Sequence, residues 1–164
     1  MFNNNWFISS KIVAHTGLWF DGIRMTYGDL EASNHGGLGG NENTCNIASG
    51  DKIIRVTGRK LVGCGLYYAL QFHTKDGATC TFNSASGGGT SFDISMDGQY
   101  LSHISGTLCT NYIGNAPGDL TFHWSPIPPS TTTTTTTNEP TNEPTTEPTN
   151  EPTTELTTEP TTSH

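Results

Sequence analysis

A repeat of about 48 residues runs through most of this 164-residue chain and limits the folds open to it. The segment Gly17–Phe20 recurs as Gly65–Tyr68, and a third copy begins at Gly114 and ends after Trp124. Repeats of this kind are supersecondary units that bury their apolar faces against one another. The repeat therefore predicts a body of three similar units, the third of which is completed by the N-terminal strand.

The repeat also serves as an internal comparison. When Gly17 is aligned with Gly65, Asp21 of the first copy matches Ala69 of the second. Both copies keep the turn, but only the first has a carboxylate beside it. Because a purely structural turn does not explain that difference, the alignment indicates a functional role for Asp21.

Each copy is predicted to form short strands separated by turn residues. Apolar and polar residues alternate with period two, and Gly, Asn, Asp and Ser separate the runs. No window keeps a 3.6-residue period long enough for a helix. The predicted strands are Trp6–Ile8, Ile12–His15, Ile23–Gly28, Cys45–Ile47, Ile53–Gly58, Leu66–Thr74, Ala78–Phe82, Phe92–Met96, Tyr100–Ser105 and Asp119–Trp124. The domain is therefore predicted to be all-β: a sandwich, barrel or prism.

Charge and hydropathy exclude several kinds of partner. Residues 1–125 hold all seven Lys and Arg and nine of the fifteen acids, so this part is nearly neutral. It has no basic surface for nucleic acid or anionic membrane. No apolar run approaches the roughly 20 residues of a membrane span. The first residues, Met1–Trp6, lack the basic and apolar regions of a signal peptide.

Four cysteines are scattered along the chain: Cys45, Cys64, Cys80 and Cys109. No pair has the C-x-x-C spacing of zinc or thioredoxin-like sites, so no metal or other cofactor is expected. Their even number fits disulfides in an oxidising compartment, with three connectivities if all pair. Buried free thiols acting as small apolar side chains are the alternative.

From residue 126 the composition changes to Thr, Pro and Glu, with seven consecutive threonines at Thr131–Thr137. Such a segment cannot bury a core and is expected to be extended and disordered. Thr and Pro at this density are typical of an O-glycosylated, mucin-like stalk, and an unmodified acidic linker is the alternative. The predicted domains are residues 1–125, folded, and residues 126–164, a stalk.

Two loops of the first copy have residues suited to holding a sugar. Gly17–Asp21 combines backbone N–H groups, a carboxylate and the flat face of Trp19. The Gly36–Gly40 loop allows backbone to approach closely, because glycine has no Cβ. The simpler reading of Asp21 is a turn residue that bonds its own backbone. Neither a nucleophile–base pair nor a poised pair of carboxylates is visible, so the chain is not expected to be an enzyme.

At these loops, and on to Phe122-His123-Trp124, the chain resembles the jacalin-related lectins. The resemblance covers roughly residues 8–124, with the motifs in the order and spacing of the family. It implies a β-prism of three four-stranded antiparallel sheets with pseudo-threefold symmetry. It also implies metal-independent binding of mannose- or glucose-type glycans, with galactose bound by other members.

The resemblance further implies a role for each matched residue. The matching residues are Gly17, Leu18, Trp19, Asp21, Gly39 and Gly40. Asp21 is expected to accept hydrogen bonds from two hydroxyls of one hexose, and Leu18, Trp19 and Gly40 to donate backbone N–H groups. His35 is a weaker candidate beside the loop. The family's principal site, before the last strand, has Gly118 where the aspartate would fall, with Asp119 or Asn111 as substitutes in other registers.

The resulting expectation is a lectin whose partners are glycans or glycoproteins and which can form homo-oligomers. The stalk and the cysteines together favour an extracellular or secreted location. The main alternative is a structural or adhesion domain on a mucin-like stalk that binds no sugar.

Overall fold

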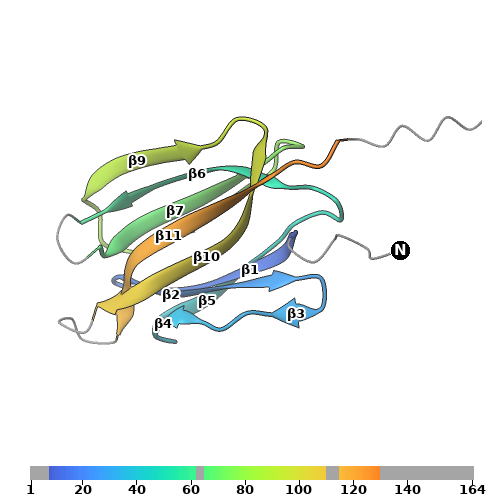
Figure 1. Ribbon diagram of the computed structural model, residues 1–164. Helices are drawn as coiled ribbons and strands as arrows, with labels where there is room; N and C mark the ends of the chain where they lie inside the picture. The colour runs from blue at the N-terminus through green and yellow to red at the C-terminus, as the bar shows by residue number, and fades with distance from the viewer. Residues whose placement is uncertain (1–7, 62–64, 110–114, 130–164) are drawn as a thin grey trace, which may run out of the picture. The chain divides into compact units, whose positions relative to one another are not determined.

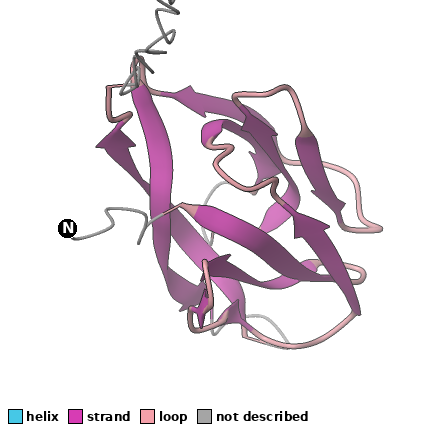
Figure 2. Cartoon of the chain, turned by 90° about the vertical axis from the view of Figure 1, so that its right-hand side faces the viewer, coloured by secondary structure: helices cyan, strands magenta, loops and turns pink. Residues whose placement is uncertain are grey.

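The computed structural model describes residues 8–61, 65–109 and 115–129. These residues form eleven β-strands joined by turns and loops (Figures 1 and 2). Within the described ranges there is no helix that could cross a membrane. The prediction of an all-β fold is confirmed.

Sheet A is built on the hairpin of β1 (Ser9–Thr16) and β2 (Phe20–Tyr27). On one side, β5 (Asn41–Asn46) pairs with β1. On the other, β3 (Leu30–Glu31) and β4 (His35–Gly36) pair with β2. All these pairings are antiparallel. The two short strands β3 and β4 were not predicted, because two residues are too few to show an alternating pattern.

Sheet B repeats this arrangement in the order β8-β7-β6-β9. Its central hairpin is β6 (Ile53–Lys60) with β7 (Tyr67–Thr74), flanked by β8 (Thr79–Asn83) and β9 (Thr90–Ser95).

Sheet C is the third central hairpin, β10 (Gln99–Cys109) with β11 (Ala116–Pro126). Four strands were expected here, and two lie within the described ranges. The N-terminal segment predicted to complete this sheet falls largely in residues 1–7, outside those ranges.

The core lies where the inner faces of the three central hairpins meet. Alternate residues of each hairpin point inward, as the period-two pattern predicted. Burying one such side chain stabilises the fold by about 1.5–3 kcal/mol. The central members are Ile12, Ala14, Phe20, Ile23, Met25, Val56, Tyr67, Leu70, Phe72, Leu101, Ile104 and Leu120.

Strand register corrects the predicted alignment of the repeats. Across each hairpin a small residue faces a core aliphatic one: Ala14 pairs with Ile23, Gly58 with Leu70, and Gly106 with Leu120. Two residues before these aliphatics stand Asp21, Tyr68 and Gly118. Tyr68, not Ala69, is therefore the counterpart of Asp21. The alignment on Gly17 and Gly65 was wrong because the loop after β6 is longer than the loop after β1.

A disulfide joins Cys45 in β5 to Cys80 in β8, with the two Cα atoms 5.7 Å apart. It links an outer strand of sheet A to an outer strand of sheet B. Cys109 is also disulfide-bonded. The alternative of free thiols is therefore wrong for these three cysteines.

Candidate functional site: the Asp21 loops

The fold brings together four of the predicted site residues from two separate loops. A Cβ at Gly39 would lie 3.3 Å from Cγ of Asp21, and a Cβ at Gly17 would lie 3.3 Å from its Oδ2. The same point on Gly17 is 3.2 Å from Cα of Gly40. Asp21 thus sits in a cradle of glycine backbone, where any side chain at these positions would crowd its carboxylate.

Gly40 is required by its backbone conformation as well as by space. Its φ is +68°, a region that residues with a Cβ rarely adopt. A Cβ there would lie 2.5 Å from the carbonyl oxygen of Thr16. The second copy repeats this feature at Gly89, with φ +78° and a Cβ position 2.7 Å from the Lys60 oxygen. The close approach of the glycine-rich loop to the hairpin is therefore a property of the repeat.

The carboxylate of Asp21 has unused capacity to accept hydrogen bonds. It makes no hydrogen bond or ion pair to any other residue in the described part of the chain. Burial raises the pKa of Asp21 above its ordinary value, and the nearby charge of His15 partly opposes that rise. A turn aspartate would bond its own backbone, and Asp21 does not. The alternative that Asp21 is only a turn residue therefore does not account for a carboxylate without hydrogen-bond partners among the described residues.

Backbone hydrogen bonds hold the two loops in place around Asp21. The N–H of Gly37 donates to the Asp21 carbonyl oxygen at 2.7 Å. The carbonyl of Gly17 accepts from Ala85 at 2.7 Å, in the loop between β8 and β9. The Leu18 carbonyl accepts from Ser86 in the same loop at 3.1 Å, while its side chain is 63% exposed. The tip of the hairpin is thus anchored to sheet B and faces solvent.

Trp19 does not stand alone beside the loop. Its ring centroid is 5.7 Å from that of Tyr68, with the planes tilted by 49°. Tyr68 in turn lies beneath the second glycine-rich loop, where a Cβ at Gly89 would be 2.9 Å from its Cδ2. At this position, therefore, sheet B has the aromatic ring of Tyr68 and sheet A has the carboxylate of Asp21.

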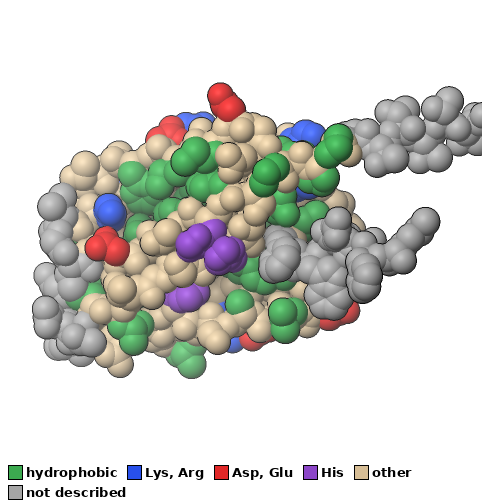
Figure 3. Space-filling view, viewed as in Figure 1, with side chains coloured by type: hydrophobic (Ala, Val, Ile, Leu, Met, Phe, Trp, Pro, Cys, Tyr) green, Lys and Arg blue, Asp and Glu red, His purple; other side chains and the backbone are tan. Residues whose placement is uncertain are grey.

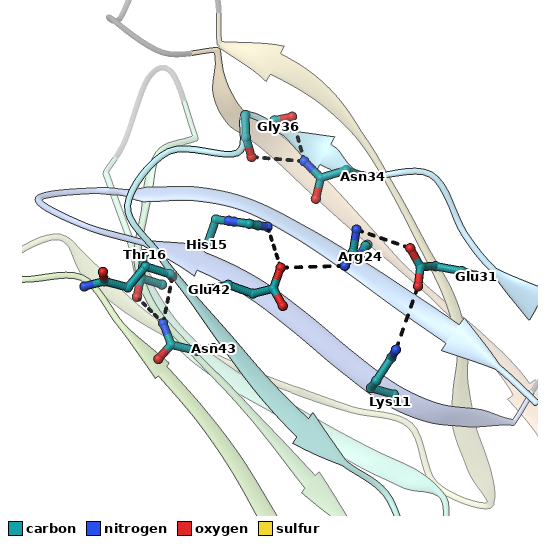
Figure 4. A network of polar contacts seen from close by, with 11 residues as sticks. Lys11, His15, Thr16, Arg24, Glu31, Asn34, Gly36, Glu42 and Asn43 are labelled. Carbon is teal, nitrogen blue, oxygen red and sulfur yellow. Dashed lines mark hydrogen bonds and ion pairs between the residues drawn. The ribbon is translucent and has the colours of Figure 1, made fainter.

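Two asparagines that the sequence did not single out support the glycine-rich loop (Figure 4). Asn34 donates from Nδ2 to the carbonyl oxygens of Gly36 and Gly37, at 2.8 and 3.0 Å. Asn43, after the loop, donates to Oγ1 of Thr16 at 2.9 Å. Asn34 thus fixes the glycine backbone, and Asn43 ties the strand after the loop to the end of β1, before any ligand arrives.

A chain of charges lies next to the loops on sheet A (Figure 4). Glu42 is 3.7 Å from His15 Nε2 and 3.7 Å from Arg24, which also pairs with Glu31 at 3.2 Å. Arg24 is thus shared between two glutamates, and Lys11 also pairs with Glu31, at 3.8 Å. None of these residues belongs to a recognisable sequence motif, so the sequence alone could not have identified this network of ion pairs.

None of the weaker candidates in the described ranges makes a hydrogen bond or ion pair to Asp21. His35 is in β4 opposite Ile23, and its side chain has no hydrogen bond or ion pair within the described ranges. Asp119 is 3.5 Å from Lys60 Nζ, and the side chain is 67% exposed. Gly118 holds the position that corresponds to Asp21. Asn111 lies outside the described residues.

Histidines gather on the face that carries β10 and β11 (Figure 3). The rings of His103 and His123 stack with centroids 4.0 Å apart. Burial, and then the charge of His123, lower the pKa of His103. Among the described residues no three His, Cys, Asp or Glu side chains are grouped to hold a metal ion.

The Asp21 loops have the chemistry of a shallow polar binding site. One carboxylate can accept from two neighbouring hydroxyls, and charge-assisted bonds of this type are the stronger ones. In the described part of the chain the backbone N–H groups of Leu18 and Gly39 donate to no other backbone group.

Comparisons with known proteins agree with this fold. Residues 3–115 match the family described as Jacalin-like lectin domain. A prostate-specific WGA16 glycoprotein lectin is 20% identical with a TM-score of 0.63, covering 74% of this chain and 85% of that one. A mannose-binding jacalin-related lectin from Ananas comosus is 18% identical with a TM-score of 0.58, covering 77% and 88%.

A Malaysian banana lectin is 19% identical with a TM-score of 0.60, covering 76% of this chain and 86% of that one. Curated protein sequences gave no match. The structural likeness establishes the β-prism fold, and the family match covers more than half of the sequence. The chain therefore belongs to the jacalin-like lectins, a family of carbohydrate-binding proteins rather than enzymes.

Proposed function

We propose that this protein binds mannose- or glucose-type glycans, without a metal ion, through the Gly17–Asp21 and Gly36–Gly40 loops. The observation that supports this most directly is the carboxylate of Asp21. It is partly buried, lies against glycine backbone, and makes no hydrogen bond or ion pair to another described residue. An acceptor held in this way is suited to hydroxyl groups that arrive from outside.

In the proposed complex Asp21 accepts hydrogen bonds from two hydroxyls of one hexose, such as O4 and O6. The backbone N–H groups of Leu18 and Trp19 donate to ring or hydroxyl oxygens. Gly39 and Gly40 admit the edge of the sugar, and the Gly40 N–H donates to O3. A single sugar in so open a site should bind weakly, with a Kd of about 1 mM.

Relatives with this fold support the choice of sugar. One of them is named as a mannose-binding lectin, and artocarpin has been solved in complex with mannotriose. Jacalin itself has been solved with the T-antigen, so the fold alone does not select one sugar. The mannose or glucose assignment here rests on the resemblance of the Gly17–Asp21 loop.

The test is binding of the full chain to immobilised mannose. Asp21→Asn keeps the shape of the side chain and removes the charge, and we expect at least a tenfold loss of binding. Asp29→Asn is the matched control, because Asp29 is exposed in the turn between β2 and β3. Equal binding by wild type and Asp21→Asn would move the site elsewhere. No binding by folded wild type would favour the scaffold alternative.

We further propose an extracellular or secreted location. The Cys45–Cys80 disulfide supports it, since structural disulfides persist in oxidising compartments. The predicted stalk over residues 126–164 supports it by composition alone. Retention of the disulfide in protein recovered from culture medium, measured by mass spectrometry, tests this location.

A further inference from the structure

A hollow that Asp21 does not line lies on the outer face of sheet B. It has a volume of about 510 Å³, within the roughly 300–1,000 Å³ of small-molecule sites. It lies across the four strands in the order β8, β7, β6 and β9, of which β7, β6 and β9 are labelled in Figure 1. Nothing in the proposed function uses it.

Strand register explains why this face is hollow. One row across the sheet runs Ser91, Arg59, Ala69 and Asn83. Ala69 is the smallest side chain of the row and stands in its middle, so the flanking residues form walls around it. Thr57, Gln71 and Asp93 line the hollow from the next row, and the Asp93 carboxylate is paired with Arg55.

The hollow has a positive charge with no partner. In the part of the chain that the structure describes, no acid lies within ion-pair distance of Arg59. The other arginine of β6 differs: Arg55 makes two bonds to Asp93, at 2.8 and 2.5 Å. Arg59 thus keeps its five donors free in a planar fork, a geometry that matches a carboxylate or sulfate.

Neutral groups around Arg59 complete a donor set for a sugar. Gln71 accepts from Thr57 Oγ1 through Oε1 at 3.2 Å, which leaves its amide nitrogen available to donate. Asn83 and Ser91 are exposed and make no hydrogen bond to another described side chain. Hydroxyl and amide groups of this kind recognise the ring hydroxyls of a saccharide.

We infer that the outer face of sheet B is a second saccharide site, which takes a sugar residue carrying a carboxylate or sulfate group on Arg59. The inference goes beyond the proposed function and does not depend on Asp21. The Asp21 site is negatively charged and the Arg59 site is positively charged, so the two sites should prefer different ligands. A carboxylate at C6 would be repelled by Asp21 and attracted by Arg59.

Three glucose derivatives test this with the full chain: methyl glucoside, methyl glucuronide and glucose 6-sulfate. They share one ring and differ in the charge at C6. Binding is followed by NMR shift changes and by calorimetry. We expect the glucuronide, the sulfate or both to shift resonances of Arg59, Gln71 and Asn83, and methyl glucoside to leave them unchanged.

Arg59→Gln should weaken binding of the anionic sugars at least tenfold. Lys75→Gln is the matched control, because it removes one exposed cation outside the hollow. Ala69→Leu keeps the charge and fills the middle of the hollow, so it should also abolish binding. Asp21→Asn should leave anionic binding intact.

Equal losses in Arg59→Gln and Lys75→Gln would reveal general electrostatic attraction and overturn the inference. So would the absence of anionic-sugar binding by folded wild type, or its loss in Asp21→Asn. Mannose binding that survives in Arg59→Gln leaves the proposed function standing whatever the anionic sugars do. A response to only one of the two anions identifies which group the site takes.

Discussion

At the scale of single residues, Gly40 tests whether the cradle around Asp21 is needed. Gly40→Ala places a Cβ 2.5 Å from Thr16 oxygen and forces a residue with a side chain into φ +68°. We expect the glycine-rich loop to move and mannose binding to be lost. The readouts are mannose binding and thermal unfolding of the same samples.

Gly50→Ala is the control for Gly40→Ala. Gly50 has φ +83°, but a Cβ there would meet nothing within 4 Å. Gly50→Ala should lose only about 1–2 kcal/mol of folding stability, the cost of a side chain at positive φ, and should bind mannose as wild type does. Similar binding by both variants would show that the loop position does not matter.

The raised pKa of Asp21 predicts acid-sensitive binding. The ionised carboxylate accepts charge-assisted hydrogen bonds from two hydroxyls, and the protonated acid accepts more weakly, so binding falls as Asp21 takes up a proton. Because burial raises this pKa, with His15 opposing, the loss should begin at a higher pH than for an ordinary aspartate of pKa about 3.9. Mannose affinity measured from pH 7 to pH 4, with intrinsic fluorescence to confirm folding, checks this. A midpoint at or below the ordinary value would contradict the role of burial.

At the scale of elements, Asp51 ties two turns of sheet B together. It is 3% exposed, and its Oδ1 accepts from the backbone N–H of Lys52 at 2.7 Å and of Asp76 at 3.2 Å. Burial acts to raise the pKa of Asp51, but these bonds, with Thr74 and Lys75, hold it below its ordinary value. The stabilisation is therefore present above pH 4 and is lost as pH falls through the lowered pKa.

Asp51→Asn should lower the free energy of unfolding by about 2 kcal/mol at pH 7. The difference from wild type should shrink toward pH 2, where wild type loses the same charge. Asp97→Asn changes an exposed aspartate and should match wild type. Chemical denaturation at several pH values measures all three proteins, and a pH-independent difference would exclude the charge as the cause.

Much of the fold could be predicted because its elements are local. Alternation along β6 and β7 identified strands whose inner residues are in the core, and the repeat indicated the number of hairpins. The predictions that were wrong or missing concern features that depend on residues far apart in the sequence. The β6–β7 loop length shifted the repeat by one residue, and the partners of Asp51 come from a turn 25 residues away.

The candidate site divides in the same way. The glycines and Asp21 could be proposed from the sequence, and the structure brings them together, because each is a distinctive residue type at a fixed place in its loop. Asn34 and Asn43 were missed, since an asparagine that bonds a loop carbonyl or a neighbouring strand has no distinctive spacing. The hollow at Arg59 arises from four strands side by side, and only the register shows that Ala69 stands in its middle.

At the scale of the folded unit, three similar hairpins carry three different residues at one position. Asp21 is polar and open, Tyr68 is 8% exposed and packs against Trp19, and Gly118 has no side chain. A Cβ at Gly118 would lie 2.8 Å from Oγ1 of Thr107 and 3.1 Å from its carbonyl oxygen, so Thr107 would have to shift for an aspartate to fit there. The pseudo-symmetry of the backbone is therefore not a symmetry of function.

This asymmetry predicts one neutral-sugar site per chain. Calorimetry with a mannose oligomer should give a stoichiometry of one, and Asp21→Asn should remove the whole signal rather than a fraction of it. A residual signal in Asp21→Asn would mean that another loop binds mannose. Since one weak site gives little affinity for a cell surface, several chains acting together would be needed for tight attachment. Light scattering of the same samples then decides whether those chains are joined in an oligomer or act as separate monomers.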